Sequence, residues 1–239
     1  MVHNFVDQNR YMNMKNNSNQ LTKNMLPIFW SDDYVLDSGI ETRTKSGPLA
    51  AILKNGEIPD VEILAPTPAS REELLTIHEP QYIDQLISGD KELMRSILAS
   101  TGGVRDALDA MFKYGKAGSL SSGLHHAKPD KDYGLCYING LALAALRAIK
   151  HHGAKTVGVC DLDSHCGGGT FLMLGDNPNV ILADVSCNSF DSWRPKSDRH
   201  HLKIIDNSNE YLDAVKVALT HLSGVDALIY NAGMDPFED

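Results

Sequence analysis

Short apolar runs alternate with amphipathic segments along most of this chain. The apolar runs are four to six residues long and, in the second half, rich in β-branched side chains. Such runs predict buried strands, expected at 27–30, 61–65, 156–161, 179–183 and 226–230. Between them, apolar side chains recur every three to four positions and predict helices, at 48–55, 71–89, 103–114, 139–150 and 210–222. Helices between apolar strands predict βαβ units, a mainly parallel sheet and a three-layer α/β fold.

Local signals mark several boundaries of these elements. Ser70 and Glu73 have the spacing of a helix capping box, and Pro80 is expected to restart the helical run that follows. Residues 1–25 are polar and show no apolar period, so we expect a loose N-terminal extension there. Residues 26–239 are expected to form a single domain.

Polar side chains come directly after the predicted strand at 156–161. Asp161, Asp163 and His165 are two residues apart, so a strand extended to its end would place them on one side. Asp235 follows the last predicted strand. Neighbouring parallel strands end at the same edge of a sheet, where open α/β sheets bind ligands. Two carboxylates and an imidazole suit a Zn²⁺ ion with one open position, although acidic caps at strand ends have the same pattern.

Two adjacent histidines, His125 and His126, follow a stretch rich in glycine and serine. Imidazoles beside a metal site can carry protons near neutral pH. A second pair, His151 and His152, ends a predicted helix, where histidine suits the helix dipole; we interpret that pair as structural.

Composition excludes some classes of function. The formal net charge of -9 argues against a nucleic-acid groove, and no apolar run approaches the length of a membrane span. The N-terminus lacks the apolar core of a secretion signal, and the four cysteines form no C-x-x-C pair. We therefore expect a cytoplasmic protein with reduced cysteines that binds neither nucleic acid nor membranes.

Four segments match one family in order and spacing. They are GLHHAKPD at 123–130, GLCYIN at 134–139, DLDSHCG at 161–167 and NAGMDP at 231–236. They resemble the histone deacetylase superfamily, which includes bacterial acetylpolyamine amidohydrolases and acetoin-utilisation-type deacetylases. The resemblance runs from about residue 27 to the C-terminus. It implies the arginase/deacetylase-like sandwich and a zinc-dependent amidohydrolase that removes acyl groups from acetyl-lysine or acetylpolyamines.

The resemblance also implies roles for individual residues. Asp163, His165 and Asp235 would be the metal ligands, for Zn²⁺ or alternatively Fe²⁺. The catalytic set would be His126 as general base, His125 as its electrostatic partner and Asp161 as the carboxylate bound to His125. A K⁺ site would comprise Asp161, Asp163, His165, Ser186 and Cys187. The wall of the substrate channel would include Gly134 and Leu135.

The chain departs from the family pattern at several points. Gly168 stands where the family often has Asp or Asn to orient the base, so His126 is expected to lack that partner. Leu135 replaces an aromatic of the channel wall. The sequence ends four residues after Asp235, before the family's Gly-rich tyrosine loop, and none of its eight tyrosines stands in such a loop. We expect the last strand of the sheet to be absent and the exposed edges to cause self-association into a homo-oligomer.

Two alternatives to an active deacetylase remain at this point. A shortened family member could bind metal and an acyl-amine, or a protein partner, without turnover. A two-metal ureohydrolase of the arginase type shares the architecture but needs a D-x-H-x-D order, whereas this chain has D-x-D-x-H at 161–165.

Overall fold

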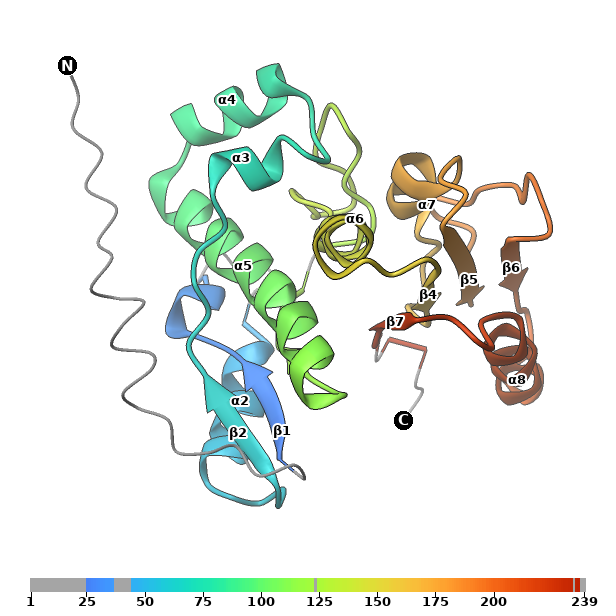
Figure 1. Cartoon of the computed structure of the whole chain (residues 1–239), viewed down its shortest axis with the longest axis horizontal. Helices are drawn as coiled ribbons and strands as arrows, with labels where there is room; N and C mark the ends of the chain where they lie inside the picture. Colours follow the sequence, from blue (N-terminus) through green and yellow to red (C-terminus); the bar gives the residue numbers. More distant parts are fainter. Residues whose placement is uncertain (1–24, 37–43, 123, 234, 237–239) are drawn as a thin grey trace.

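The computed structural model describes residues 25–36, 44–122, 124–233 and 235–236 (Figure 1). Its strands are β1 (Leu26–Phe29), β2 (Val61–Leu64), β3 (Gly118–Ser119), β4 (Val157–Asp161), β5 (Val180–Ser186), β6 (His200–Ile204) and β7 (Ala227–Asn231). Its α-helices are α2 (Ser46–Lys54), α3 (Arg71–Leu74), α4 (Pro80–Ser88), α5 (Lys91–Tyr114), α6 (Gly140–His152), α7 (Gly168–Leu174) and α8 (Tyr211–His221). Two short 3-10 helices, η1 (Asp32–Tyr34) and η3 (Ser208–Glu210), complete the elements. The predicted extension at 1–25 lies, except for its last residue, outside the described residues.

The fold is α/β with parallel strands, as predicted, but the described strands form two sheets. One has the order β2-β1-β3, and the other has the order β6-β5-β4-β7. Every pair of these strands is parallel. β3 and β7 each have one edge without a strand partner among the described residues. Helix α5 packs on β1 and β3, α6 packs on β4 and β7, and the two helices pack against each other (Figure 1).

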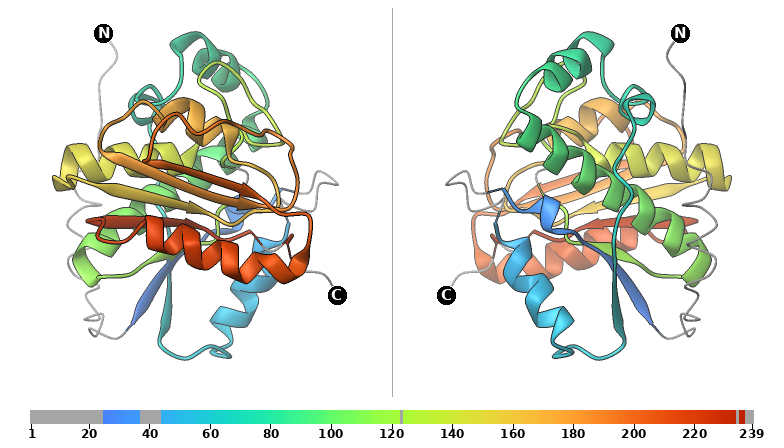
Figure 2. Two further views of the ribbon diagram at one scale, coloured as in Figure 1. Left: turned by 90° about the vertical axis from the view of Figure 1, so that its right-hand side faces the viewer. Right: turned by 90° about the vertical axis from the view of Figure 1, so that its left-hand side faces the viewer.

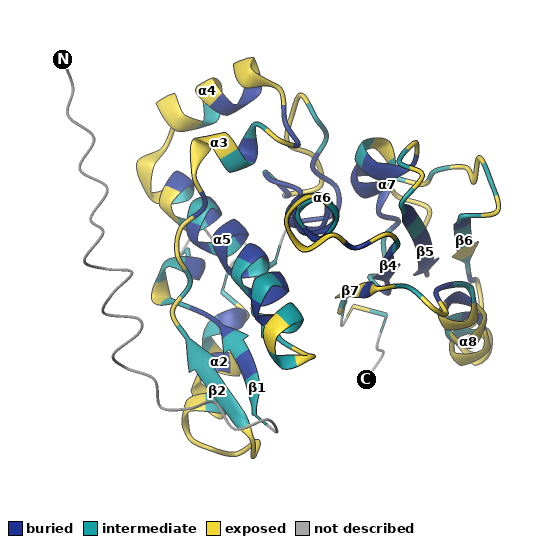
Figure 3. Cartoon of the chain, viewed as in Figure 1, coloured by how far each residue is buried: buried dark blue, intermediate teal, exposed yellow. Residues whose placement is uncertain are grey.

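The four-stranded sheet is covered on both faces (Figure 2). Val157 and Val159 of β4 belong to the apolar cluster that includes α6, whereas Cys160 belongs to the cluster that includes α8. This alternation follows from the pleat of a strand. Because both faces are covered, β4 is apolar up to Asp161 and β5 is apolar up to Asp184. All five residues of β4 are buried (Figure 3). The same alternation directs Asp161 to the α6 face.

Helix α5 is longer than predicted. The prediction began the helix at Gly103, whereas it begins at Lys91, and Gly102 and Gly103 are adjacent near its middle. Both glycines lie inside the helix, where they permit close packing. A side chain at Gly102 would overlap the Thr67 carbonyl, and one at Gly103 would overlap the Tyr34 hydroxyl.

Other predicted boundaries agree more closely with the structure. Ser70 and Glu73 form the predicted capping box, and α4 begins at Pro80. The prediction missed β3, β6 and α7. Strand β6 is a polar edge strand that, among the described strands, pairs only with β5, so its sequence lacks an apolar run. None of the described helices has the length and apolar character needed to cross a bilayer.

Candidate metal and catalytic site

The candidate site begins where β4 and β7 end side by side. Asp161, the last residue of β4, is in register with Asn231, the last residue of β7. The strand ends at Asp161, as predicted, and residues 162–167 form a loop, so the condition under which Asp161, Asp163 and His165 share one strand face is not met. This loop is held in part by the Asp161 carboxylate, whose Oδ1 accepts a hydrogen bond from the Asp163 amide at 3.2 Å.

Three possible metal-binding side chains meet at this edge. One ligand atom from each of Asp163, His165 and Asp235 lies within 4.8 Å of the other two. Nδ1 of His165 is 3.2 Å from Oδ1 of Asp163 and 3.2 Å from Oδ2 of Asp235. The Ser164 amide donates to Asp235 at 3.1 Å and connects the two loops. Two carboxylates and one imidazole on a partly exposed surface are a donor set that fits Zn²⁺ or Fe²⁺.

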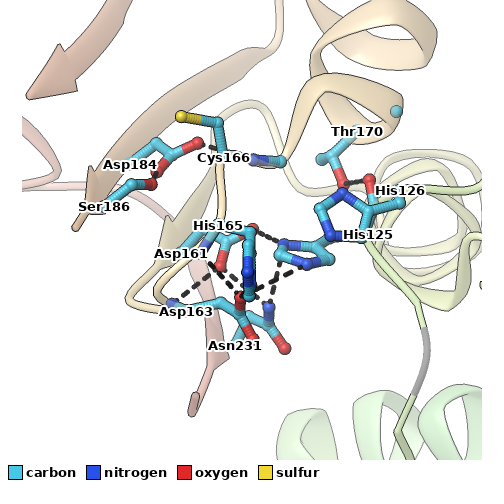
Figure 4. Close-up of polar contacts among 12 residues, drawn as sticks. His125, His126, Asp161, Asp163, His165, Cys166, Thr170, Asp184, Ser186 and Asn231 are labelled. Carbon is cyan, nitrogen blue, oxygen red and sulfur yellow. Dashed lines mark hydrogen bonds and ion pairs between the residues drawn. The ribbon is translucent and has the colours of Figure 1, made fainter. Parts of the chain in front are cut away.

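His125 is bound by a buried carboxylate. Its Nδ1 is 2.8 Å from Oδ2 of Asp161, and the Asn231 amide donates to the other oxygen of Asp161 at 2.8 Å (Figure 4). Burial lowers the pKa of His125, but the charge and hydrogen bond of Asp161, with the charge of Asp163, outweigh burial and raise it to about 9. His125 therefore carries a positive charge at neutral pH.

His126 has a partner that the sequence analysis did not find. Its Nδ1 is 3.0 Å from Oδ2 of Asp191, so the expectation that His126 lacks a carboxylate partner is wrong. Burial lowers the pKa of His126 below its ordinary value, and the neighbouring His125 adds to that effect, although Asp191 opposes it. A carboxylate at Nδ1 makes that nitrogen the proton donor and leaves Nε2 as an acceptor.

The backbone of the histidine pair is fixed from two helices. Asn139 is the N-cap of α6, and its side-chain amide donates to the carbonyls of His125 and Ala127 at 3.3 and 3.4 Å. The backbone amide of Thr170, in α7, donates to the His125 carbonyl at 3.0 Å. Together these hydrogen bonds orient both imidazoles toward the ends of β4 and β7. Figure 4 shows His125, His165 and Asp161 converging there.

The predicted channel residues lie beside His126. Gly134 has a φ of +53°, and a side chain there would overlap the His126 ring. Leu135 is half exposed and also has a positive φ, of 62°. Leu135 replaces an aromatic residue of the family's channel wall, but two other aromatic rings lie beside His126. Tyr133 and Phe190 stack at 5.1 Å between ring centroids, and the Phe190 ring meets the His126 ring edge-on at 5.1 Å.

The remaining K⁺ candidates border the same loop. Ser186 is buried and lies 2.5 Å from the Asp184 carboxylate. Cys187 is exposed, and its amide donates to the Ser164 carbonyl at 2.9 Å. Burial and the nearby charge of Asp161 raise the pKa of Asp184 to about 7. The structure therefore brings Ser186 and Cys187 against the 161–165 loop, together with a second buried carboxylate, Asp184, that the sequence analysis did not single out.

Asp191 and Asn139 are the main residues that sequence reasoning missed. Asn139 had a signal, since an asparagine directly before an apolar helical run is typical of an N-cap. Asp191 had an indirect signal only, because Gly168 left the base without an expected partner. The second pair of histidines agrees with its structural interpretation: His152 ends α6, is 2.7 Å from Asp109 and stacks on Phe112.

Comparison with known proteins relates the chain to one group. A sequence profile described as the histone deacetylase domain matches residues 41–232. The chain is 27% identical over 192 residues to an uncharacterized protein of Picosynechococcus, covering 72% of this chain and 64% of that relative. It is 30% identical over 178 residues to histone deacetylase 8 of Arabidopsis thaliana, covering 66% of this chain and 47% of that relative.

A solved structure shares the fold. The crystal structure of the HDA15 HD domain matches with a TM-score of 0.78 and 18% identity, over 90% of this chain and 73% of that one. The chain spans about half to two thirds of the length of the two curated relatives above.

Proposed function

Because this chain belongs to the histone deacetylase family, whose members are hydrolases, we propose that it is a metal-dependent amidohydrolase. Its proposed substrates are amines that carry an acetyl or similar acyl group, such as acetyl-lysine in a peptide or an acetylpolyamine. The proposed metal is Zn²⁺, with Fe²⁺ as the alternative.

One observation carries this proposal: the His125–His126 pair lies beside the Asp163, His165 and Asp235 cluster. The ring centroids of His126 and His165 are 6.0 Å apart, and Nε2 of His125 is 3.6 Å from Oδ1 of Asp163. Metal-assisted hydrolysis of an amide needs a Lewis acid and a proton carrier within reach of one carbonyl group. This arrangement supplies side chains for both.

Asp163, His165 and Asp235 would hold the metal ion, which when bound supplies Lewis-acid polarisation of the acyl carbonyl. His126 is the proposed general base, because its lowered pKa leaves it neutral at pH 7 and its Nε2 free to accept a proton from water. The same nitrogen would return that proton to the departing amine. His125, charged at neutral pH, would stabilise negative charge that develops on the acyl oxygen.

The surroundings of the pair suit a narrow acyl-amine. The stacked rings of Tyr133 and Phe190 offer an apolar face beside His126 for an alkyl chain. The acidic chain, with a net charge of -9, favours substrates whose remaining amines are positively charged. These features support lysine side chains and polyamines over anionic substrates.

The test uses the full chain, stripped of metal and then reconstituted with one equivalent of Zn²⁺ or, without oxygen, Fe²⁺. Acetate release is measured from an acetyl-lysine peptide and from an acetylpolyamine. We expect turnover that needs the added metal and that falls about 10²–10⁴-fold in His126→Ala. A folded, metal-loaded protein that releases no acetate from either probe would overturn the proposal.

The second candidate function, binding without turnover, has lost one of its supports. It drew on Gly168 as the cause of an unpartnered base, and His126 is bound to Asp191 instead. An acetyl-lysine peptide that binds but is never cleaved would favour this candidate. Two Mn²⁺ ions per chain, with hydrolysis of a guanidino compound, would favour the ureohydrolase.

We also propose that the protein self-associates. Strand β7 has an edge without a strand partner among the described residues, and Leu228 and Tyr230 on it are 45% and 57% exposed. Exposed apolar edge strands are prone to pair with another chain. Light scattering should give a mass above that of a monomer, and a monomer mass at micromolar concentration would contradict this proposal.

A further inference from the structure

The carboxylate of Asp191 reaches His126 from a segment far from it in sequence. Besides the His126 contact, its Oδ2 accepts a hydrogen bond from the Gly169 amide at 3.2 Å, and its Oδ1 forms an ion pair with Lys128. The side chain is only 8% exposed. Both oxygens therefore have fixed donors, and the carboxylate cannot turn away from His126 without losing them.

Gly168 and Asp191 share one small space. A Cβ atom at Gly168 would overlap the carbonyl oxygen of Asp191 and lie 2.5 Å from its carboxylate oxygen. A side chain at position 168 and the present position of Asp191 therefore exclude each other. The absence of a side chain at 168 is what lets the carboxylate of Asp191 approach His126.

The loop that carries Asp191 is held on several sides. Phe190 packs edge-on against His126 and stacks on Tyr133. The Phe190 amide donates to the Asn188 side chain at 2.7 Å, and its carbonyl accepts from the Cys166 amide at 3.1 Å. Asp191 has a φ of +55°, a conformation that Asp tolerates better than most residues. Aromatic stacking and hydrogen bonds thus fix the backbone on which this carboxylate depends.

We propose that Asp191 is the positioning residue of His126, which holds the imidazole with its proton on Nδ1 and its Nε2 toward the reacting atoms, and that Gly168 is the position that makes this possible. The expected effect of Asp191 on turnover rests on the proposed function. Its expected effect on which His126 nitrogen carries the proton does not depend on turnover. The groups that the Asp191 side chain binds belong to His126, Lys128 and Gly169, none of which is a proposed metal ligand.

The first experiment is Asp191→Asn in the full chain, because Asn has the same shape and also tolerates a positive φ. We expect kcat for the acetyl-lysine peptide to fall about ten- to hundredfold while KM stays within about twofold. Asp198→Asn, an exposed aspartate of the same segment, is the matched control and should keep the wild-type kcat. Wild-type kcat in Asp191→Asn would overturn the proposal.

The second measurement needs no metal and no turnover. Nitrogen-15 NMR of the imidazoles in the metal-free protein reports which ring nitrogen carries the proton. We expect His126 to hold it on Nδ1 in the wild type and to lose that preference in Asp191→Asn. If the wild type proves inactive but this change is seen, the proposed function fails and the positioning role stands. An unchanged His126 tautomer would overturn the positioning role even in an active protein.

The third experiment moves the carboxylate. Asp191→Gly leaves a residue that adopts the positive φ at no cost, and Gly168→Asp is then added to it. We expect the double variant to regain at least tenfold in kcat over Asp191→Gly, with the Nδ1 proton restored. If kcat of the double variant is no higher than that of Asp191→Gly, the claim that a carboxylate at position 168 can replace that of Asp191 is overturned.

Discussion

His125 and His126 are neighbours in the chain, with ring centroids 3.9 Å apart, but they belong to two differently built regions. The strand-end region binds His125 through Asp161 and Asn231, which are the register-paired last residues of β4 and β7. The loop region binds His126 through Asp191, which comes from an irregular segment after β5.

The two carboxylates differ in what else they bind. Asp161 accepts hydrogen bonds from neutral groups besides His125, so the imidazolium of His125 receives the full effect of its charge. Asp191 also forms an ion pair with Lys128, which shares that charge. The pKa of His125 therefore rises to about 9, whereas burial prevails at His126 and its pKa falls. At His126, burial and the positive charge of the neighbouring His125 outweigh Asp191, so the two imidazoles differ in charge at neutral pH.

The largest expected effect comes from removing the base itself. His126→Ala should lower kcat by about 10²–10⁴-fold, the usual contribution of a general acid or base, with metal content unchanged. Steady-state kinetics and metal analysis of the same sample provide the measurement. His151→Ala, at the exposed end of α6, is the control and should match the wild type. Equal rates in both variants would remove His126 from the chemistry.

Asp161→Asn should come next, with a loss of about ten- to hundredfold in kcat/KM. The variant removes the negative charge of Asp161 that raises the pKa of His125. The pKa of His125 should therefore fall from about 9, in the direction in which burial acts. The alkaline limb of the pH profile, where His125 loses its proton, should move to lower pH. A limb that stays near pH 9 would show that His125 is not the group that titrates there.

His78 is a reference for burial without a carboxylate. Its hydrogen bonds are to the Pro129 carbonyl and the Asn139 amide, and burial lowers its pKa to about 4. Between pH 4 and 6.5 the unfolded chain binds this proton and the folded chain does not, so stability should rise with pH across that window. From pH 5.5 to 7 the gain should be about 1 kcal/mol.

Denaturant unfolding at the two pH values measures this gain, and His78→Gln is the comparison. Gln has a donor for the Pro129 carbonyl and an acceptor for the Asn139 amide, and it does not titrate. Its stability should therefore change by about 1 kcal/mol less between pH 5.5 and 7 than that of the wild type. Parallel curves for the two proteins would mean that His78 takes up its proton equally in both states.

Lys128→Met should have the smallest effect and the most diagnostic one. Without Lys128, the charge of Asp191 would act on His126 alone and raise its pKa. The acid limb of kcat/KM should move to higher pH by about half a unit to one unit, so that activity falls severalfold at pH 6 and little at pH 8. Lys131→Met, on the exposed side of the same turn, should leave the limb in place.

The strand-end region was the more predictable of the two from sequence. Apolar runs placed β4 and β7, and parallel strands must end at a common edge, so Asp163, His165 and Asp235 were expected to meet. Asp161, Asp163 and His165 would share one face only in a strand that continued past Asp161. The strand ends there, because Asp161 uses a side-chain oxygen to bind the Asp163 amide and the chain turns. A turn held by one side chain leaves no periodic signal.

The loop region was much less predictable. His126 and Asp191 are 65 positions apart, and the segment around Asp191 has no apolar period that would place it. The contact also depends on an absent side chain at Gly168, and a missing group does not indicate what fills its space. Strand β6 was missed for a related reason, since it is an edge strand with polar residues on it. The pattern of apolar residues predicts which positions are buried. It does not predict which residue a side chain from an irregular loop will contact.

The division of the strands into two sheets has a consequence for how the molecule opens. No backbone ladder crosses from β3 to β7 in the described part of the chain. The two halves are linked through the packing of α5 on α6 and through hydrogen bonds such as those of His78 to Pro129 and Asn139. Amide exchange should then resolve two cooperative units with separate opening free energies. The clustered acidic and imidazole groups all belong to the later unit, or to the segment leading into it. His78, in the earlier unit, accepts a hydrogen bond from the backbone amide of Asn139, so opening of that unit removes one support of the residue that holds the histidine pair.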